Sequence, residues 1–306
     1  MDVSALIEQL DIPSAISPNE CYRLFHGRGH AFPDFEYINI DWLPPVALIT
    51  LYQDVEPSAL GLLAQALQQR LPHAESIQVQ YRHQHGGPFE VLLGKPFEQT
   101  VVEENGLKFH IQLGKAQNTG LFLDMRNGRE WVRQHANDKR VLNLFAYTCG
   151  FSVAALAGGA SHVVNIDNNK SVLSKGRENH RLNQHDLKRV TFERVDIFKS
   201  FSRLRKHGPY DLLVCDPPSF QQGSVDIRRD YKKIIRRLPE FMNPGSELML
   251  CLNSPDLDEP FLLDMVAEAC PACEFIQRLP NPEIFKEAMA GKGLKVLLFR
   301  YLGDEA

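Results

Sequence analysis

The chain has few cysteines and no long apolar run. No stretch of about 18 apolar residues occurs, so we expect no membrane-spanning helix and no membrane partner. Six cysteines among 306 residues are too few for a disulfide framework, which favours a reducing, cytoplasmic location. The first 17 residues lack a basic segment followed by an apolar stretch. We therefore expect no secretory signal there.

The composition is that of a globular protein, and its charge is unevenly distributed. Hydrophobic residues make up 43% and charged residues 24%, which excludes a disordered chain, a collagen or a coiled coil. The net charge is −4, but residues 170–240 hold 17 Lys+Arg against 9 Asp+Glu, a local excess of 17 − 9 = +8. The rest of the chain then carries −4 − 8 = −12. A basic face on an acidic body indicates nucleic-acid binding, with solvated helix faces as the alternative.

Two sequence patterns meet near residue 120, which fits the two domains that the length favours. The earlier part is irregular and rich in Pro, Gly and His, and its short elements predict a small α+β domain. The expected elements are strands at 35–41, 46–52 and 76–82, a helix at 58–71, and a hairpin across Asn105-Gly106. We assign an extension to 1–20, the small domain to 21–100, a β-hairpin linker to 101–120 and a second domain to 121–306.

From about residue 127, apolar strand-like runs alternate with helical stretches. Such alternation predicts a parallel sheet covered on both faces. The expected strands are 141–145, 162–166, 190–195, 211–215 and 247–252, and the expected helices are 152–157, 170–183, 197–207, 227–242 and 257–269. Strand-like runs at 274–278 and 295–302 have no full helix between them, so the last strand can return antiparallel. The prediction is an α/β fold with a mostly parallel seven-stranded sheet and a terminal antiparallel hairpin.

Ligands of such sheets bind beyond the carboxyl ends of the strands. The first strand leads into Asn143-Leu-Phe-Ala-Tyr-Thr-Cys-Gly150-Phe151, which is weak as a dinucleotide fingerprint because it holds a single glycine. Asp167 follows the second strand and can accept hydrogen bonds from ribose hydroxyls. Asp196 follows the third strand, where it can meet an adenine amino group or cap the next helix.

The fourth strand ends in the sharpest signal of the chain, Asp216-Pro217-Pro218-Ser219-Phe220. Two prolines fix φ and remove two backbone donors, which leaves a stiff turn with carbonyls free to accept hydrogen bonds. The Asp216 carboxylate adds an acceptor and Phe220 adds a flat aromatic face. The segment therefore predicts a site for a planar, amino-bearing heterocycle. The alternative is an ordinary loop with a proline pair.

These segments, together with Gly120-Leu-Phe-Leu-Asp124-Met-Arg126, resemble S-adenosylmethionine-dependent methyltransferases that modify bases of large-subunit ribosomal RNA, the I and K types. The resemblance covers roughly residues 21 to 302, including Arg23-Leu-Phe-His-Gly-Arg-Gly-His, Pro33 and Asp41 in the small domain. It implies a class I, Rossmann-like methyltransferase domain, S-adenosylmethionine as cofactor and ribosomal RNA as partner. The I type also carries an N-terminal PUA domain; because only roughly 20 residues precede the resemblance, we expect no such domain in this sequence.

The resemblance also implies residue roles. The cofactor-binding residues would be Phe122, Asp124, Arg126, Phe145, Ala146, Tyr147, Thr148, Gly150, Asp167, Asp196 and Asp216. The base would be positioned by Asp216, the carbonyls of Pro217 and Pro218, and Phe220, with Asn253 assisting. The family usually has Gly where this chain has Cys149. Because a cysteine disfavours positive φ, we expect either weakened cofactor binding or a turn of another conformation.

Which base atom is methylated depends on whether the protein supplies a cysteine nucleophile. A base nitrogen has or develops a lone pair that can be aligned with the methyl group, whereas pyrimidine C5 first needs a cysteine thiolate to add at C6. Asn253 stands where the I type has that cysteine, and Cys251 lies two residues earlier on the same strand face. Cys215 is expected in the core. The sequence favours nitrogen; methylation of cytosine C5 through Cys251, and a non-catalytic RNA-binding relative, are the alternatives.

A basic helix follows the proline pair. Arg229, Lys232, Lys233 and Arg236 share one face by their spacing, which predicts contact with an RNA backbone; a solvated helix surface is the alternative. Cys270-Pro-Ala-Cys273 has no second cysteine pair, and His83-Gln-His85 has no acid nearby in the sequence. We therefore expect no metal site. The sequence leaves a homo-oligomer open.

Overall fold

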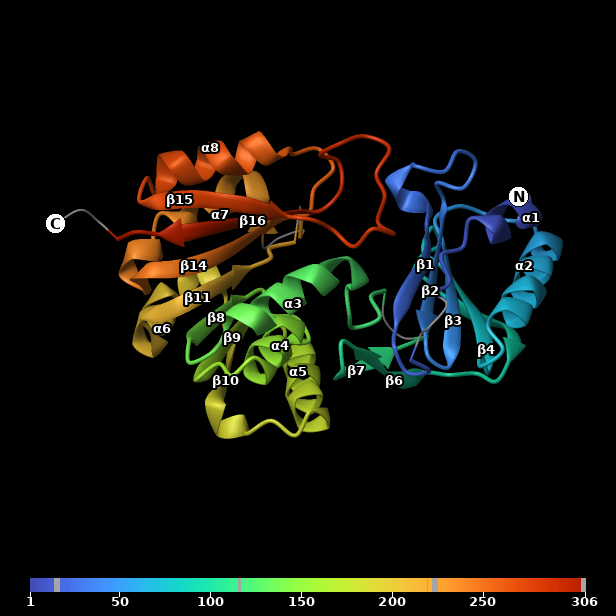
Figure 1. Cartoon of the computed structure of the whole chain (residues 1–306), viewed down its shortest axis with the longest axis horizontal. Helices are drawn as coiled ribbons and strands as arrows, with labels where there is room; N and C mark the ends of the chain where they lie inside the picture. Colours follow the sequence, from blue (N-terminus) through green and yellow to red (C-terminus); the bar gives the residue numbers. More distant parts are fainter. Residues whose placement is uncertain (14–16, 115–116, 219, 222–224, 304–306) are drawn as a thin grey trace. The chain divides into compact units, whose positions relative to one another are not determined.

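The computed structural model describes residues 1–13, 17–114, 117–218, 220–221 and 225–303 (Figure 1). The chain divides into two compact units. Unit 1 comprises Met1–Leu123 and Pro282–Ala290, and unit 2 comprises Asp124–Asn281 and Gly291–Ala306. Residues 1–20 and the hairpin at 101–120 thus fall within unit 1. Pro282–Ala290 also joins unit 1, although the sequence analysis assigned this segment to the second domain.

Unit 1 is built on a five-stranded sheet with the order β1-β2-β3-β4-β5. Only β3 and β4 run parallel, because α2 connects them as a crossover, and the other pairs are antiparallel. A separate hairpin, β6-β7, turns at Asn105 and Gly106 as expected. The elements are α1 (Val3–Glu8), β1 (Tyr22–His26), η1 (Gly27–Gly29), β2 (Ile38–Leu43), β3 (Val46–Leu51), α2 (Pro57–Arg70), β4 (Ser76–Tyr81), β5 (Phe89–Gly94), β6 (Gln99–Glu104) and β7 (Leu107–Gln112).

Unit 2 contains a seven-stranded sheet with the order β10-β9-β8-β11-β14-β16-β15. The first five strands are parallel, and β16 is antiparallel to both β14 and β15. The predicted α/β fold is therefore confirmed. The strands are β8 (Arg140–Leu144), β9 (His162–Asp167), β10 (Val190–Arg194), β11 (Tyr210–Cys215), β14 (Met242–Leu252), β15 (Cys273–Leu279) and β16 (Lys295–Tyr301), and the short β12 (Phe220–Gln221) pairs with β13 (Val225–Asp226).

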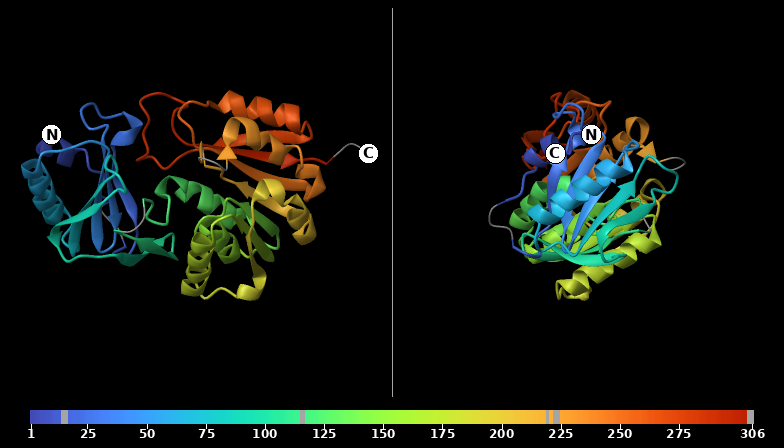
Figure 2. Two further views of the ribbon diagram at one scale, coloured as in Figure 1. Left: turned by 180° about the vertical axis from the view of Figure 1, so that it is seen from behind. Right: turned by 90° about the vertical axis from the view of Figure 1, so that its right-hand side faces the viewer.

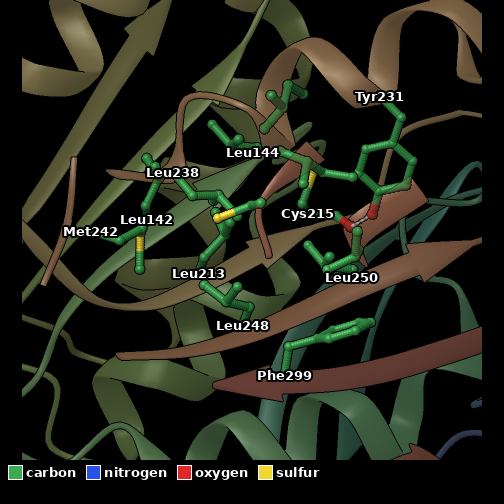
Figure 3. Packing of buried hydrophobic residues seen from close by; sticks show 14 of the residues in the cluster. Leu142, Leu144, Leu213, Cys215, Tyr231, Leu238, Met242, Leu248, Leu250 and Phe299 are labelled. Atoms are coloured by element: carbon green, nitrogen blue, oxygen red, sulfur yellow. Dashed lines mark hydrogen bonds between the residues drawn. The ribbon is translucent and has the colours of Figure 1, made fainter. Parts of the chain in front are cut away.

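Helices cover both faces of this sheet (Figures 1 and 2). One layer holds α3 (Arg126–His135), α4 (Gly150–Ala157) and α5 (Lys170–Leu182), and the other holds α6 (Phe201–His207), α7 (Ile227–Ile235) and α8 (Glu259–Ala269). Short 3-10 turns are η2 (Leu123–Met125), η3 (Leu187–Arg189), η4 (Ile197–Lys199) and η5 (Leu238–Glu240). Alternate residues of each strand face opposite layers: Leu213 and Cys215 pack with Tyr231 of α7 (Figure 3), whereas Leu212 and Val214 face the α3–α4 layer.

Several helices are shorter than the sequence predicts. The stretch 227–242 ends as α7 at Ile235 and continues as η5, because Pro239 lacks the N–H that an α-helix would need. The stretch 197–207 divides into η4 and α6 at Ser200. Helix α8 begins at Glu259 rather than 257, since Asp258 caps it. No helix among the described ranges has both the length and the apolar character needed to cross a membrane.

The turn between β8 and α4 packs tightly against α5. Cys149 has a left-handed φ of 63° and a fully buried side chain. A Cβ atom at Gly176 of α5 would lie 2.8 Å from the Cβ of Cys149 and closer still to its Sγ. Asn179, one turn further along α5, donates a hydrogen bond from Nδ2 to the Thr148 carbonyl at 3.0 Å. The cysteine is therefore accommodated in a left-handed turn because glycine faces it across the helix interface.

Replacing Gly176 by alanine is expected to lower the free energy of unfolding by about 2 kcal/mol through overpacking. The additional replacement Cys149→Gly should recover part of this loss, with a coupling of about 1 kcal/mol or more between the two sites. Urea unfolding in a Trp42→Phe background isolates the fluorescence of Trp131, which lies in unit 2. Gly61→Ala, where a Cβ meets nothing within 4 Å, is the control and should not lower the same transition. Additive effects of the two substitutions would contradict the packing argument.

Candidate functional site

The carboxyl edge of the parallel strands gathers most of the residues singled out from the sequence. Strand β8 lies between β9 and β11, so the segment after β8 is flanked by Asp167 at the end of β9 and by Asp216 after β11. Strand β14 pairs with β11 on the far side, and Asn253 follows its last residue. Sheets of this kind bind ligands at such an edge, where the strand order reverses.

The segment after β8 is backbone-strained and firmly held. Phe145, Tyr147 and Cys149 have φ values of 55°, 47° and 63°, a conformation that L-residues avoid. The Ala146 N–H donates to Ile166 O at 3.0 Å, and the Cys149 N–H donates to Ala146 O at 2.8 Å. Residues forced into this conformation cluster at ligand sites.

The remaining predicted members of this segment follow the same turn. Thr148 is buried, and its carbonyl accepts from Asn179. Gly150 is the first residue of α4. The structure thus places four of the five predicted residues from 145 to 150 in one short connection between β8 and α4, and the fifth, Gly150, at the first position of α4.

Asp167 ties this segment to β9. Its Oδ2 accepts from the Tyr147 N–H at 2.9 Å, and its Oδ1 accepts from the Asn169 N–H at 2.9 Å. Burial raises the pKa of Asp167, while the hydrogen bonds from Asn169 and Tyr147 oppose the rise. Each carboxylate oxygen has further acceptor capacity, so the residue can hold the turn and still bind hydroxyl groups.

Asp196 has the capping role that the sequence offered as one of its two interpretations. Its Oδ1 accepts from the Phe198 N–H at 2.9 Å at the start of η4, and its Oδ2 lies 3.6 Å from Lys199 Nζ. The side chain is 43% exposed. A second role toward an adenine amino group stays a prediction.

A charged cluster surrounds the end of β11. The partly buried Asp216 is influenced by the carboxylate of Asp124, in the turn before α3, and by the guanidinium of Arg129, on α3. Burial, followed by the charge of Asp124, raises the pKa of Asp216 to about 7, and Arg129 opposes this rise. A carboxyl group with a pKa raised in this way is a candidate functional group of the site.

A hydrogen bond from α7 anchors the backbone that leads into the proline pair. Tyr231 of α7 donates a hydrogen bond from its hydroxyl to the Cys215 carbonyl at 3.1 Å (Figure 3), which fixes the backbone directly before Asp216. Pro217 is buried and Pro218 partly buried. Ser219 lies outside the described residues, and for Phe220 only the backbone, in β12, is described. The predicted contact of the Phe220 ring with a base therefore stays a prediction.

The two cysteines near the site lie on opposite faces of the sheet. Cys215 belongs to the core beneath α6–α8, as expected, and Cys251 belongs to the core beneath α3 and α4. Both side chains are fully buried. Burial raises the pKa of Cys251 well above its ordinary value, and the nearby Asp216 carboxylate adds to the rise. Asn253, two residues later, is exposed.

Buried polar side chains form a hydrogen-bonded network next to the segment after β8. Asn143 donates to Asn165 at 2.9 Å, and Asn165 donates to Ser152 Oγ at 2.9 Å. Ser152 Oγ lies 2.9 Å from His180 Nε2, whose ring faces His185 through Nδ1 at 3.0 Å. Burial lowers the pKa of His180 to about 3. These side chains therefore form a neutral hydrogen-bonded network that connects β8, β9, α4 and α5.

Two predicted cofactor residues belong to different units. Arg126 begins α3 in unit 2, close in sequence to Asp124. Phe122 belongs to unit 1 and is 42% exposed. Both roles stay predictions.

The predicted RNA-binding face of α7 is largely occupied by ion pairs within the chain. Arg229 and Lys233 both contact the buried carboxylate of Asp230, at 2.8 and 2.7 Å. Lys232 pairs with Glu268 of α8. Arg236, at the end of α7, is exposed. The positive charge available to a partner is therefore smaller than the sequence count indicates.

The structure adds Arg129 to the site, which the sequence analysis did not identify. It is 4% exposed on the face of α3 that also buries Trp131 and Val132. An arginine on the apolar face of an amphipathic helix is a sequence signal for a buried charge partner.

Among the described residues, no group of three or more His, Cys, Asp and Glu side chains could hold a metal ion. Asp54, 29 residues away in the sequence, lies 2.8 Å from His83, so the fold brings an acid to this histidine that the sequence neighbourhood does not contain.

Comparisons with known proteins agree with this fold. A family model described as S-adenosylmethionine-dependent methyltransferase matches residues 22–300. Ribosomal RNA large subunit methyltransferase I of Cronobacter sakazakii (strain ATCC BAA-894) is 30% identical over 272 residues, which are 85% of this chain and 68% of that protein. The protein of the same name from Enterobacter sp. (strain 638) is 36% identical over 185 residues, 58% of this chain and 47% of that protein.

The chain thus spans between about half and two thirds of the length of the curated relatives it matches. The solved structure of SMU.776 complexed with SAH matches with a TM-score of 0.87 and 24% identity, covering 98% of this chain and 82% of that chain. At this identity the similarity shows the fold alone. The relatives' names confirm the resemblance to the I type, and the family model covers most of both units. The chain therefore belongs to the S-adenosylmethionine-dependent methyltransferase family.

Proposed function

We propose that this protein transfers a methyl group from S-adenosylmethionine to a base nitrogen of RNA, with ribosomal RNA as the substrate class. The observation that carries the proposal is the position of Asp216. It follows β11 at the reversal point of the sheet and precedes two prolines, and burial raises its pKa to about 7.

The residues at this edge fit the cofactor chemically. S-adenosylmethionine supplies an electrophilic methyl group on a positively charged sulfur. Asp167 offers acceptors for ribose hydroxyls, Asp124 and Asp216 offer negative charge, and Arg129 offers positive charge. The strained segment from Phe145 to Gly150 would cradle the methionine part, with Asp196 toward the adenine. This set of charges complements a ligand that carries a carboxylate, an ammonium group and a sulfonium.

Asp216 and the prolines would hold the base. The ionised carboxylate accepts a hydrogen bond from an exocyclic amino group, and the carbonyls of Pro217 and Pro218 supply further acceptors. Neither proline has an N–H, so the backbone of these two residues presents acceptors only. The anchored Cys215 carbonyl keeps this turn in place, and Asn253 lies at the neighbouring strand end. An amino-bearing base is therefore the preferred acceptor, aligned rather than activated covalently.

The state of Cys251 favours nitrogen over pyrimidine C5. A thiolate is the reactive form of cysteine, and burial with a nearby carboxylate keeps this thiol protonated. Its side chain packs among Val214, Met249 and Val296 in the core rather than at an exposed surface. Both observations weigh against a covalent intermediate at this residue.

Ribosomal RNA as the substrate class rests on the names of the relatives, which describe methyltransferases of large-subunit ribosomal RNA. The exposed Arg236 on α7 adds a positive side chain on the helix that follows the base-binding turn. The ion-paired Arg229, Lys232 and Lys233 could contribute to phosphate binding by exchanging their carboxylate partners for RNA phosphates.

Cofactor binding is expected to release protons near pH 7. A positive sulfur stabilises the ionised form of Asp216, so its pKa falls from about 7 when the sulfonium binds. Calorimetry in buffers of different ionisation enthalpy should therefore show more proton release for S-adenosylmethionine than for its uncharged product, S-adenosylhomocysteine. The Asp216→Asn variant should abolish the difference. Equal release for both ligands in the wild-type protein would contradict the assigned position of Asp216.

Substitutions distinguish methylation at a base nitrogen from methylation at pyrimidine C5. Cys251→Ala should retain methyl transfer within about threefold, whereas Asp216→Ala should lower kcat/KM by about 100-fold or more because the base is no longer oriented. Cys215→Ala, which removes a buried thiol on the opposite face, controls for loss of packing. If Cys251→Ala were inactive and Cys215→Ala active, carbon methylation would replace the proposal.

The substrate is tested by nucleoside mass spectrometry of ribosomal RNA from cells with and without the gene. We expect one methylated nucleoside to be missing without the gene and to return on complementation with the wild-type chain but not with Asp216→Ala. Its mass and fragmentation identify the methylated atom. Identical ribosomal RNA profiles would contradict ribosomal RNA as the substrate.

A further inference from the structure

Lys295 is a buried cation at the edge of the sheet that carries the site. It is the first residue of β16, which runs antiparallel to β14, and it lies opposite Leu252, the last residue of β14. The antiparallel direction therefore brings the beginning of β16 to the edge where the parallel strands end. The lysine is 0% exposed, which is rare for this residue type.

The ammonium group donates three hydrogen bonds to backbone carbonyls. Its Nζ lies 2.7 Å from Ser254 O, 2.7 Å from Leu257 O and 2.9 Å from Gly291 O. An ammonium has three donors and no acceptor, so carbonyl oxygens are suitable partners for it. Charge-assisted hydrogen bonds of this kind are about twice as strong as neutral ones.

Two of these carbonyls belong to the connection between β14 and α8, directly after Asn253. This connection contains no regular helix or strand from Asn253 to the cap of α8 at Asp258. Ser254 and Leu257 are buried within it, whereas Asn253 is exposed. Lys295 thus holds both ends of the Ser254–Leu257 turn, and this fixes where the chain after β14 presents Asn253.

The third carbonyl belongs to the residue where the chain returns to unit 2. The segment Pro282–Ala290 is part of unit 1, and Gly291 is the first residue of unit 2 after it. The stretches that flank the segment Pro282–Ala290 contact each other within unit 2, where Asn281 Nδ2 donates a hydrogen bond to Leu294 O at 3.0 Å. Asn127 of α3, next to the predicted cofactor residue Arg126, donates to Pro280 O at 3.0 Å. One ammonium therefore links this returning chain to the connection after β14.

We propose that Lys295 is a positioning residue for the base that receives the methyl group: its ammonium holds the Asn253–Asp258 connection in the arrangement that accepts the base beside Asp216. This role rests on the proposed function. Lys139 offers a comparison at the opposite edge of the sheet, where it pairs with Glu247 near the start of the β14 segment that joins β11.

The test compares Lys295→Met with Lys139→Met. Methionine keeps the length of the side chain but donates no hydrogen bond, so the carbonyls of the connection lose their partner. For Lys295→Met we expect amide hydrogen exchange in residues 253–258 to rise about tenfold or more. We expect kcat/KM for RNA to fall by about 100-fold, while the Kd for S-adenosylmethionine stays within about threefold of wild type. Lys139→Met should change neither the exchange of 253–258 nor kcat/KM by more than about threefold.

Unchanged exchange in 253–258 would overturn the proposal, as would a loss of cofactor affinity equal to the loss of RNA turnover. If Lys295→Met does not fold, Lys295→Gln, which keeps an N–H donor group but no charge, is measured in the same way. The exchange readout needs no RNA, so it reports on Lys295 even if the wild-type protein methylates no RNA. A wild-type protein that methylates no RNA would contradict the proposed function. The exchange data would then still show whether Lys295 holds the Asn253–Asp258 connection.

Discussion

The alignment of parallel strand ends along one edge is the constraint on which the site depends. Because β9, β8, β11 and β14 are neighbours with the same direction, residues from four separate stretches of the chain are collected there. The reversal of strand order at β8 sends the following helices to opposite layers. The antiparallel β16 then adds a residue from its own beginning, Lys295, to the same edge.

The site is assembled from features that are unfavourable by themselves. Three residues after β8 have left-handed backbone conformations, and the Asp216 carboxyl is shifted toward its neutral form by burial. The surrounding structure compensates through Asp167, Asn179 and the buried polar network next to them. Such compensated strain is typical of ligand sites, where geometry matters more than local stability.

The basic stretch of the sequence illustrates how tertiary structure modifies charge. Residues 170–240 carry a formal excess of +8, yet the α7 side chains Arg229, Lys232 and Lys233 lie in ion pairs with carboxylates of the chain. Their carboxylates reduce the field that a polyanion meets, so the proposed contact of this helix with RNA would depend on exchange of ion-pair partners as well as on charge count.

The sequence by itself determined the α/β fold, the terminal hairpin and the segments that line the carboxyl edge, because these follow from periodicity and from residues adjacent to strand ends. The prolines after Asp216 and the acid at Asp167 could be identified in the same way. Tertiary structure alone decided the rest. Whether Cys251 can react depends on burial, and the roles of Arg129 and Lys295 depend on partners distant in the chain. Burial and long-range contacts are properties of the packed chain, and local sequence patterns do not encode them.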